Sequence, residues 1–346
     1  MKKVGIVGHF GFGHNLLNGQ TIKVKILSEE FQNELGSENV MNVDTHGGAK
    51  RVPAIIGNTV TMFQNCENCM VLPAYKGVLV FTPLFSLLNK IYHRKTYYIV
   101  VGGWLDSYLN KYKWLEKLLK NYTAICVETT TMKNALEKRG FKNIELVANC
   151  KELPELSIQE LPHSFTEPYA LCTFSRVMKG KGIENLIHAI QKVNETAGNI
   201  VYTLDIYGEV WKDYINEFEA MQKEFPDYIK YKGSVNYDQS VDILKNYFAL
   251  AFPTLFYTEG IPGTIIDAYA AGLPVISSRW ESYEDVVEDN VTGVGYEFGS
   301  DEALIETLET IQSNPQKVID MKVACLRKSK EFSPKVIVGG FTKKFF

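Results

Sequence analysis

The sequence TEGIPGTIIDAYAAGLPVISS, residues 258–278, carries two carboxylates, Glu259 and Asp267, on either side of GIPGTII. Thr258 is a suitable N-cap and Pro262 suits a first helical turn, so we expect Glu259 in a loop and Asp267 about one turn inside a helix. Carboxylates near a helix start can be simple caps. They can also accept hydrogen bonds from hydroxyl pairs, so the two together suit a sugar and a ribose.

A second segment, FSRVMKGKGIENL, brings two cations to a glycine-bearing turn. Arg176 and Lys181 follow a predicted strand, and the turn leads into a predicted helix. Two fixed cations beside a helix N-terminus suit a diphosphate, whose charge must be held when a transferred sugar departs from it. The alternative is a solvated loop with ordinary surface cations.

Two further loops follow predicted strands. Residues 8–21, GHFGFGHNLLNGQT, contain glycines that permit close backbone approach to a ligand. They do not match the dinucleotide pattern G-x-G-x-x-G, because Leu16 stands where the third glycine after Gly11 and Gly13 should fall. A substrate loop is therefore favoured over a nicotinamide site. The turn YKGSVNYDQ, with Gly233, could offer backbone groups to a base, although such turns are common.

These loops need a scaffold of parallel strands, and the chain supplies the pattern for one. Short β-rich runs alternate with helical stretches, from KVGIVG onward and again from YALCTFSRV, which is typical of βαβ units. A polar segment with three prolines, residues 154–168, separates the two series and is the best linker candidate. In open α/β sheets, ligands bind beyond the carboxyl ends of the strands, where all four segments lie.

Composition narrows the class of protein. The chain has 346 residues, enough for two domains, and a formal net charge of -3, which argues against a general nucleic-acid binder. Residues 1–165 hold 19 of the 37 basic and 14 of the 40 acidic side chains, so the remainder holds 18 and 26 and the two halves differ in sign. The longest apolar stretch, residues 78–88, is broken by Pro83 and is too short to span a bilayer.

The N-terminal run MKKVGIVGHF is interpreted as a buried strand and not as a signal peptide, so we expect a cytoplasmic protein with reduced thiols. Cys66 and Cys69 form a CxxC, but no second pair of ligands accompanies them at zinc-site spacing. A loop without metal is the favoured interpretation of NCENC.

Together the segments resemble a family. FSRVMKGKGIENL, FPTLFYTEGIPGTIIDAYAAGLPVISS and DVVEDNVTGVGYEFGSDEALIETL, in this order, resemble the retaining glycosyltransferases of family 4, which have the two-domain GT-B fold. The resemblance covers most of residues 170–312. In the first half it is weaker, where GHFGFGHNLLNGQTIKVKILSEEF resembles the glycine loop with its helix, and CVETTTMKNALEKRGFKNIELVANC has Cys150 where glycine is usual.

The resemblance implies an α/β GT-B architecture of two Rossmann-like domains whose parallel sheets face a central cleft. The expected division is an acceptor domain at 1–153, a linker at 154–168, a nucleotide-sugar donor domain at 169–330, and a C-terminal helix at 331–346 that crosses back to the first domain. We expect catalytic contacts from Glu259, Arg176 and Lys181; further donor contacts from Gly233, Gly260, Ile261, Pro262, Gly263, Thr264 and Asp267; and acceptor or phosphate contacts from Gly11, Gly13, His14, Gly19, Gln20, Gly103 and Trp104.

Three departures from the family pattern matter. The family's E-x7-E ends here in Asp267, which is one methylene shorter, and Pro262 removes an N–H from the donor loop. The usual histidine after the fourth strand is absent from YIVVGGWLDSYL. Asp106 and His14 are candidates to replace it, although each also suits an ordinary loop or cap.

The basic first half contains a segment that bears on where an acceptor is presented to the enzyme. In YLNKYKWLEKLLKNY, residues 108–122, apolar and basic side chains interleave with helical spacing. Such a helix could lie on an anionic bilayer, or it could simply pack its apolar face on the sheet.

The sequence therefore predicts a hexosyltransferase-type enzyme that moves a sugar from a nucleoside-diphosphate donor to a saccharide or lipid-linked saccharide with retention. The expected setting is bacterial surface-polysaccharide synthesis on the inner face of the cytoplasmic membrane, with no metal, no other cofactor and no nucleic acid. The alternatives are a nucleotide-sugar-binding protein without transfer activity and a GT-B epimerase that isomerises the nucleotide sugar itself.

Overall fold

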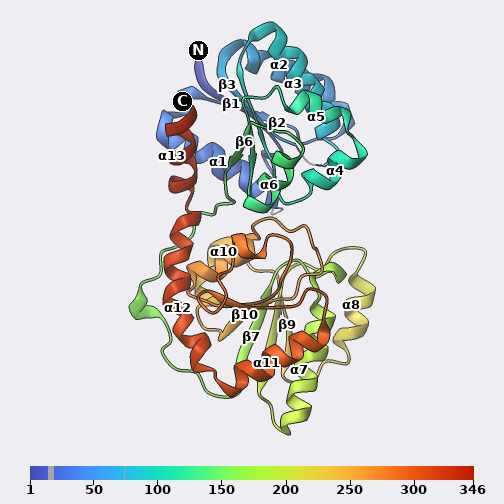
Figure 1. Cartoon of the computed structure of the whole chain (residues 1–346), viewed down its shortest axis with the longest axis vertical. Coiled ribbons are helices and arrows are strands. Elements are labelled where there is room, and N and C mark those ends of the chain that lie inside the picture. The colour runs from blue at the N-terminus through green and yellow to red at the C-terminus, as the bar shows by residue number, and fades with distance from the viewer. Residues whose placement is uncertain (15–18, 74) are drawn as a thin grey trace. The chain divides into compact units, whose positions relative to one another are not determined.

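The computed structural model describes residues 1–14, 19–73 and 75–346, which form two compact units (Figure 1). The first unit is Met1–Glu152 together with Phe332–Phe346, and the second is Leu153–Glu331. The segment 154–168, predicted as a linker, lies in the second unit, where Leu161 is buried and Phe165 packs against Phe248.

The first unit is built on a six-stranded parallel sheet in the order β2-β1-β3-β4-β5-β6. Its strands are β1 (Lys2–Gly8), β2 (Val40–Asp44), β3 (Cys66–Leu72), β4 (Lys95–Ile99), β5 (Ala124–Val127) and β6 (Ile144–Leu146). Side chains alternate along each strand, so Val4 and Ile6 enter one core while Val7 enters the other.

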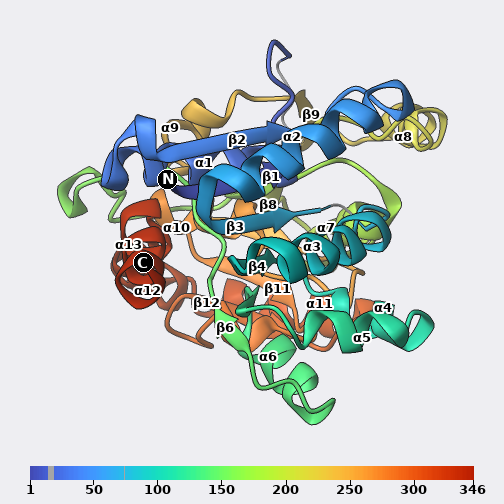
Figure 2. The ribbon, with the colours of Figure 1, turned by 90° about the horizontal axis from the view of Figure 1, so that it is seen from above.

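Helices cover both faces of this sheet. On one face lie α1 (Gly19–Leu35) and the C-terminal α13 (Pro334–Phe345), which are distant in sequence but adjacent in space (Figures 1 and 2). The opposite face is covered by α2 (Val52–Asn65), α3 (Val78–Tyr92), α4 (Leu105–Lys111), α5 (Trp114–Leu119) and α6 (Thr130–Lys138).

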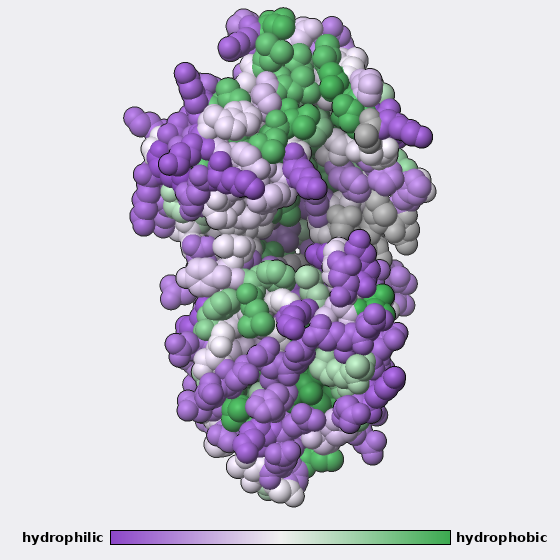
Figure 3. Space-filling view, turned by 90° about the vertical axis from the view of Figure 1, so that its right-hand side faces the viewer, coloured by the Kyte–Doolittle hydropathy of each residue, from purple (hydrophilic) through white to green (hydrophobic). Residues whose placement is uncertain are grey.

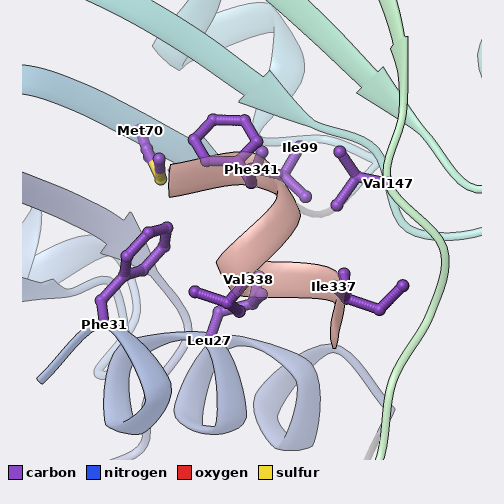
Figure 4. Close-up of a pocket in the computed structure, with 8 residues that line it drawn as sticks. All are labelled: Leu27, Phe31, Met70, Ile99, Val147, Ile337, Val338 and Phe341. Carbon is purple, nitrogen blue, oxygen red and sulfur yellow. The ribbon is translucent and has the colours of Figure 1, made fainter. Parts of the chain in front are cut away.

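A small apolar cavity of about 10 Å³ lies where α13 meets the sheet (Figure 4). Phe31 of α1, Met70 of β3 and Phe341 of α13 line it, with Leu27, Ile99, Val147, Ile337 and Val338 completing the wall. A space of this size between apolar side chains holds one water at most and stays dry, so it is a packing defect beneath α13 and not a ligand site.

Two local predictions in the first unit are wrong. Cys66 and Cys69 do not lie in a loop but in β3, which lies between β1 and β4 and whose residues are all buried except Glu67. Residues 108–122 are not one helix, because α4 ends at Lys111 and α5 begins at Trp114. Leu109, Leu115 and Leu119 of this region are buried against the sheet.

The second unit contains another six-stranded parallel sheet, in the order β12-β11-β10-β7-β8-β9. Its strands are β7 (Tyr169–Phe174), β8 (Tyr202–Tyr207), β9 (Ile229–Gly233), β10 (Ala249–Phe252), β11 (Val275–Ser278) and β12 (Gly293–Tyr296).

The helices α7 (Ile183–Ala197), α8 (Ile215–Gln222) and α11 (Asp301–Ser313) pack on one core of the second unit. The helices α9 (Ser240–Leu244), α10 (Gly263–Ala270) and α12 (Gln316–Ser329) pack against one another on the other face.

In both sheets the order of the strands reverses at one place. In the first unit the chain passes from β1 to β2 on one side and then places β3 on the other side of β1. In the second unit β8 and β9 follow on one side of β7, and β10 lies on the other. Such a switch point leaves a crevice at the carboxyl ends of the two central strands, which is where open α/β sheets bind ligands.

Candidate functional site

The loops after β7 and β10 meet at the switch point of the second unit. The Leu255 amide donates to the Gly180 carbonyl at 2.9 Å. Gly182 has a φ of 66°, and a Cβ at this position would lie 1.9 Å from the Pro253 carbonyl oxygen. Only glycine allows this approach, so the backbone itself fixes one loop against the other.

The two loops bring together Lys181 and Glu259, which are 78 residues apart in sequence. The Lys181 ammonium donates directly to Glu259 Oε1, and the Thr254 hydroxyl donates to the same oxygen at 3.2 Å. Both charged side chains are mostly enclosed, with 14% and 18% of their surfaces exposed. The sequence analysis placed both residues in one site, and the structure makes them direct partners.

Aromatic rings surround the lysine. The Lys181 nitrogen lies 5.1 Å from the centroid of Phe252 and 5.3 Å from that of Phe256. These rings lower the local dielectric and present their negative faces to the cation, which strengthens its attraction to anions.

Arg176 is on the same loop as Lys181 but is exposed. Its guanidinium lies over the ring of Trp211 at 5.4 Å, beside the short parallel bridge between Val177 and Val210. Stacking on Trp211 restricts the orientation of the guanidinium while its edge remains available to solvent. Trp211 had not been predicted as a site residue, and only its aromatic character and its place after β8 could have indicated it.

Asp267 lies within α10 and is 3% exposed. It accepts a hydrogen bond from the Ser240 hydroxyl of α9 at 3.0 Å, so it also links two helices. The predicted cap is wrong, because α10 begins at Gly263 and Pro262 occupies the N-cap position without a side-chain cap, leaving Thr258 outside the helix. Glu259 lies in the loop before the helix, as predicted.

The start of α10 contains an unsatisfied group. The Thr264 hydroxyl oxygen is buried and has no hydrogen-bond partner in the described part of the chain. Gly260 and Ile261 precede it as buried loop residues, and Gly233 ends β9 with a φ of 76°. An unpaired buried hydroxyl is costly in a folded protein, and functional sites are where such costs are found.

The switch point of the first unit holds a histidine cluster. His9 Nε2 lies 3.1 Å from His46 Nδ1, and His9 Nδ1 lies 2.7 Å from the Thr21 hydroxyl. The ring centroid of His14 is 4.8 Å from that of His46. One nitrogen of the His9–His46 pair must carry the proton that the other accepts, so the cluster can hold or move a proton. The sequence analysis named His14 but missed His9 and His46, although each follows closely on the end of a strand.

Asp44, at the end of β2, organises the loop after β1. Its carboxylate accepts hydrogen bonds from the amides of Phe10, Gly11 and Phe12 at 3.0, 3.1 and 3.0 Å, and from the His46 amide at 2.9 Å. Partial burial alone would raise the pKa of Asp44, but these amides hold it below its ordinary value. Of the predicted glycines here, Gly11 and Gly13 have positive φ, and Gly19 begins α1, while residues 15–18, with Leu16, lie outside the described part.

The loop after β4 is held in place by the buried carboxylate of Glu128. The Gly102 amide donates to Glu128 at 3.1 Å, and Glu128 forms a buried ion pair with Lys23 at 2.5 Å. The Trp104 indole donates to the Val101 carbonyl at 2.8 Å, and Gly103, between these two residues, is buried.

Two other predicted residues of the first unit have partners in the structure. Asp106 forms an ion pair with Arg139, so it stabilises the contact of α4 with α6. The Gln20 side chain donates to the Leu72 carbonyl at the end of β3, at 2.8 Å. In the ranges 1–14, 19–73 and 75–346, no group of three or more His, Cys, Asp or Glu side chains has the arrangement of a metal site.

The match to a known protein family falls within the second unit of the chain. The family described as glycosyl transferases group 1 matches residues 158–326. The amylovoran biosynthesis glycosyltransferase AmsK of Erwinia amylovora is 25% identical over 185 residues, 51% of this chain and 44% of that protein. The GtfA subunit of a UDP-N-acetylglucosamine–peptide N-acetylglucosaminyltransferase of Streptococcus pneumoniae is 27% identical over 152 residues, 43% of this chain and 29% of that protein. The matches thus span less than half of either relative.

Solved structures resemble the whole chain. The Anabaena protein HepE, in complex with UDP and glucose, has a TM-score of 0.76 at 13% identity, with 99% of both chains covered. Sucrose-phosphate synthase of Thermosynechococcus elongatus has a TM-score of 0.78 at 14% identity, with 100% of this chain and 98% of that chain covered. These likenesses confirm the predicted fold class, GT-B, with two parallel α/β sheets.

Proposed function

We propose, from the match of residues 158–326 to the glycosyl transferases group 1 family, that the protein is a glycosyltransferase with its donor site at the β7–β10 switch point. The donor is a nucleoside-diphosphate sugar and the acceptor is a saccharide, free or linked to a lipid. The anomeric configuration is retained. The observation that carries this proposal is the enclosed pair of Lys181 and Glu259.

The ion pair gives each partner a role in binding. Without a ligand, Lys181 neutralises Glu259. When a donor binds, the diphosphate attracts the ammonium of Lys181, with Arg176 as a second cation, and Glu259 turns its oxygens to sugar hydroxyls. Asp267 is proposed to contact the ribose, and the backbone of residues 260–264, with the Thr264 hydroxyl, to complete the sugar and phosphate contacts. Gly233 is proposed to lie near the base.

The proposed reaction needs the cations most when charge develops on the leaving group. The bond between the anomeric carbon and the diphosphate oxygen breaks, and its electron pair remains on the diphosphate. The acceptor hydroxyl forms the new bond from the same face and gives its proton to a leaving phosphate oxygen. Lys181 and Arg176 stabilise the departing negative charge, so we expect turnover to persist in EDTA, without a metal ion.

The acceptor is proposed to bind the first unit, at the loops after β1, β2 and β4. Gly11, Gly13 and His14 belong to this site in the proposal, as do Gly103 and Trp104. The His9–His46 pair supports it, because a hydrogen-bonded imidazole pair can orient an acceptor hydroxyl. This cluster stands in for the family histidine that the sequence lacks after β4.

The proposed setting is synthesis of a bacterial surface polysaccharide at the cytoplasmic face of the membrane. AmsK, by its name an amylovoran biosynthesis glycosyltransferase, supports a polysaccharide product. The GtfA subunit acts on peptide, so a peptide acceptor is the first alternative to test. The complex of HepE with UDP and glucose makes UDP-glucose the first donor to test.

Nucleotide binding is the direct test of the donor site. We expect UDP, GDP, ADP or CMP, added in turn, to raise the melting temperature with one clear preference, because a ligand of the native state stabilises it. In the double variant Arg176→Ala with Lys181→Ala, affinity by calorimetry should fall by about tenfold or more. The matched control is Lys179→Ala, since Lys179 is on the same turn but is 72% exposed and pairs with Glu217. Equal affinity in the double variant and the control would contradict the phosphate assignment.

Donor turnover then separates transfer from the other two functions. Slow release of the nucleoside diphosphate in water, accelerated by an acceptor, supports a transferase. Tight binding with no release under any acceptor would instead indicate a binding protein. Isomerisation of the sugar without an acceptor would indicate an epimerase.

A further inference from the structure

Helix α3 of the first unit is apolar on two opposite faces. Its inner face buries Val78, Phe85 and Leu88 against the core. Its outer stripe has Val80, Leu84, Leu87 and Ile91, spaced at i, i+4, i+7 and i+11, and Leu87 and Ile91 are 59% and 61% exposed. A surface helix normally carries polar side chains on its outer face, and a helix that is apolar all round is normally buried.

The neighbouring helix extends this surface. Val52 and Ile56 of α2 are also exposed, and α2 packs beside α3. On the other side of α3, the adjacent helix α5 begins with the exposed Trp114. Figure 3 shows apolar side chains gathered over α2 and α3 on one face of the first unit. Single exposed apolar residues are ordinary on a protein, but a continuous apolar area marks an interaction surface.

The segments that flank α2 and α3 carry mostly positive charges, and Glu116 of the neighbouring α5 is paired with Arg139. Between Thr45 and Leu105 the sequence contains six basic residues and a single acidic one, Glu67. Glu67 belongs to β3 and pairs with Lys3. Neither α2 nor α3 contains Asp or Glu, and the exposed Lys76 and Lys90 stand before α3 and within its last turn. An apolar area edged by lysines, free of carboxylates, complements a surface with an apolar interior and negative headgroups.

We propose that the outer face of α2 and α3 is a docking surface for an anionic lipid bilayer. The outer stripe of α3 enters the boundary between headgroups and acyl chains, and the lysines reach back to the phosphates. The helix has 15 residues, so it is too short to cross a hydrocarbon layer of about 30 Å and lies in the plane of the interface. No helix within the described ranges has the length and apolar character of a membrane span.

This location differs from the one that the sequence indicated. The leucines of residues 108–122 that would have faced a membrane are instead largely buried in the core. Trp114 and Lys117 of α5 are exposed, and α5 packs against α3. The inference goes beyond the proposed transfer reaction, because lipid docking needs neither the donor nor the switch-point residues.

Vesicle sedimentation with the whole chain tests the proposal. Wild type should bind vesicles of phosphatidylglycerol and phosphatidylcholine, bind pure phosphatidylcholine more weakly, and lose the difference as NaCl rises from about 0.05 to about 0.5 M. The variant Leu87→Glu with Ile91→Glu should bind anionic vesicles at least about tenfold more weakly, since two apolar anchors become anions. Lys76→Gln with Lys90→Gln should reduce the preference for anionic vesicles.

Matched controls test whether the position of the substituted residues, and not the change in net charge alone, determines vesicle binding. Ile215→Glu with Val291→Glu makes the same charge change at exposed apolar residues of the second unit, and Lys212→Gln with Lys223→Gln matches the lysine pair. Both controls should bind as wild type does. An equal loss in the control, absence of vesicle binding by wild type, or a wild-type dimer that Leu87→Glu with Ile91→Glu dissociates would overturn the proposal, the last by assigning the surface to a second copy.

Nucleotide binding distinguishes a failure of the docking proposal from a failure of the proposed function. All four variants should retain the melting-temperature shift given by the preferred nucleotide, which also shows that they are folded. Vesicle binding without any nucleotide effect would refute the donor site alone. A nucleotide effect without vesicle binding would refute the docking surface alone.

Discussion

The two switch points are built from the same kind of sheet but are held in different ways. In the second unit, backbone contact locks the loops after β7 and β10 together, and a charge pair, Lys181 with Glu259, spans them. In the first unit, the loop after β1 folds around the carboxylate of Asp44, and imidazoles replace the charge pair. A fixed cation at the second unit's switch point suits an anionic ligand such as a diphosphate, whereas imidazoles at the first unit's switch point suit a neutral hydroxyl.

The largest expected effect is at Glu259. Glu259→Ala should lower donor turnover by at least about a hundredfold, because a group that holds the reacting sugar contributes several kcal/mol to the transition state. Release of the nucleoside diphosphate measures this. The nucleotide alone should still bind, and binding should even tighten, because Lys181 loses its competing carboxylate.

The control for Glu259 is Glu224→Ala, which removes an exposed carboxylate elsewhere in the second unit. Near-normal turnover in a folded Glu259→Ala protein would remove this residue from the site. The Lys181–Glu259 pair would then hold the two loops together without taking part in the reaction.

The second prediction compares two glycines with positive φ, one from each switch point. In Gly182→Ala the new Cβ would meet the Pro253 carbonyl, so the second unit should lose about 3 kcal/mol or more of unfolding free energy. In Gly13→Ala no heavy atom of the described residues lies within 4 Å of the new Cβ, so only the backbone cost of about 1 kcal/mol remains. Denaturant unfolding of both variants provides the measurement, and equal losses would show that the two loops are equally rigid.

The same contrast explains what the sequence could predict. At the second switch point, the residues lie in short segments directly after strands, and each segment has its own glycines and charges. Glu259 and Lys181 could therefore be assigned to one site from the chemistry of their two segments and the resemblance of both segments to one family. Their direct bond could not, because it depends on the close approach of Gly182 to Pro253, between residues 71 positions apart.

The first unit was harder to predict for a physical reason. The histidine cluster joins His9 to His46 across two parallel strands, and no local pattern links them. In sequence, the outer stripe of α3 resembles part of a buried strand or core helix. The periodicity of apolar residues alone does not show which face of the helix is buried by the rest of the protein. Residues 108–122 looked like one amphipathic helix, yet the chain turns at Tyr112 so that leucines of both short helices reach the core.

The third prediction concerns the stability of the loop after β1 at low pH. Because the folded protein holds the pKa of Asp44 below its ordinary value of 3.8, its contribution to stability is present above that pH and is lost as pH falls through the lower folded value. Protection of the Phe10, Gly11 and Phe12 amides from hydrogen exchange, relative to the unfolded chain at the same pH, should therefore fall as pH drops below 3.8. Asp44→Asn should give the same loss of protection already at pH 7, and should cost about 1 kcal/mol, a modest amount because water screens the half-exposed carboxylate.

Asp227→Asn, at an exposed aspartate of the second unit, is the matched control and should change neither quantity. If the three amides stay protected in Asp44→Asn, the loop does not depend on the carboxylate. The first switch point would then be held by its backbone, as the second is.

The smallest expected effect concerns a buried lysine in each unit. Lys23 of the first unit has a carboxylate partner in Glu128, whereas Lys322 of the second donates to the Tyr247 carbonyl and lies over the ring of Phe165.

Burial lowers the pKa of Lys322 to about 8, although Cys325 and Cys172 oppose the shift. A lowered lysine pKa means that the unfolded chain binds more protons between this value and the ordinary 10.5, so stability rises with pH in this range and levels off below about 8, where both states are protonated. Between pH 7 and 9 the second unit should gain about 1 kcal/mol from this group, and Lys322→Met should remove that gain while Lys317→Met, on the exposed side of the same helix, keeps it. Calorimetric melting across this pH range measures the slope, and an unchanged slope in Lys322→Met would mean that Lys322 stays charged in the folded protein as a paired lysine does.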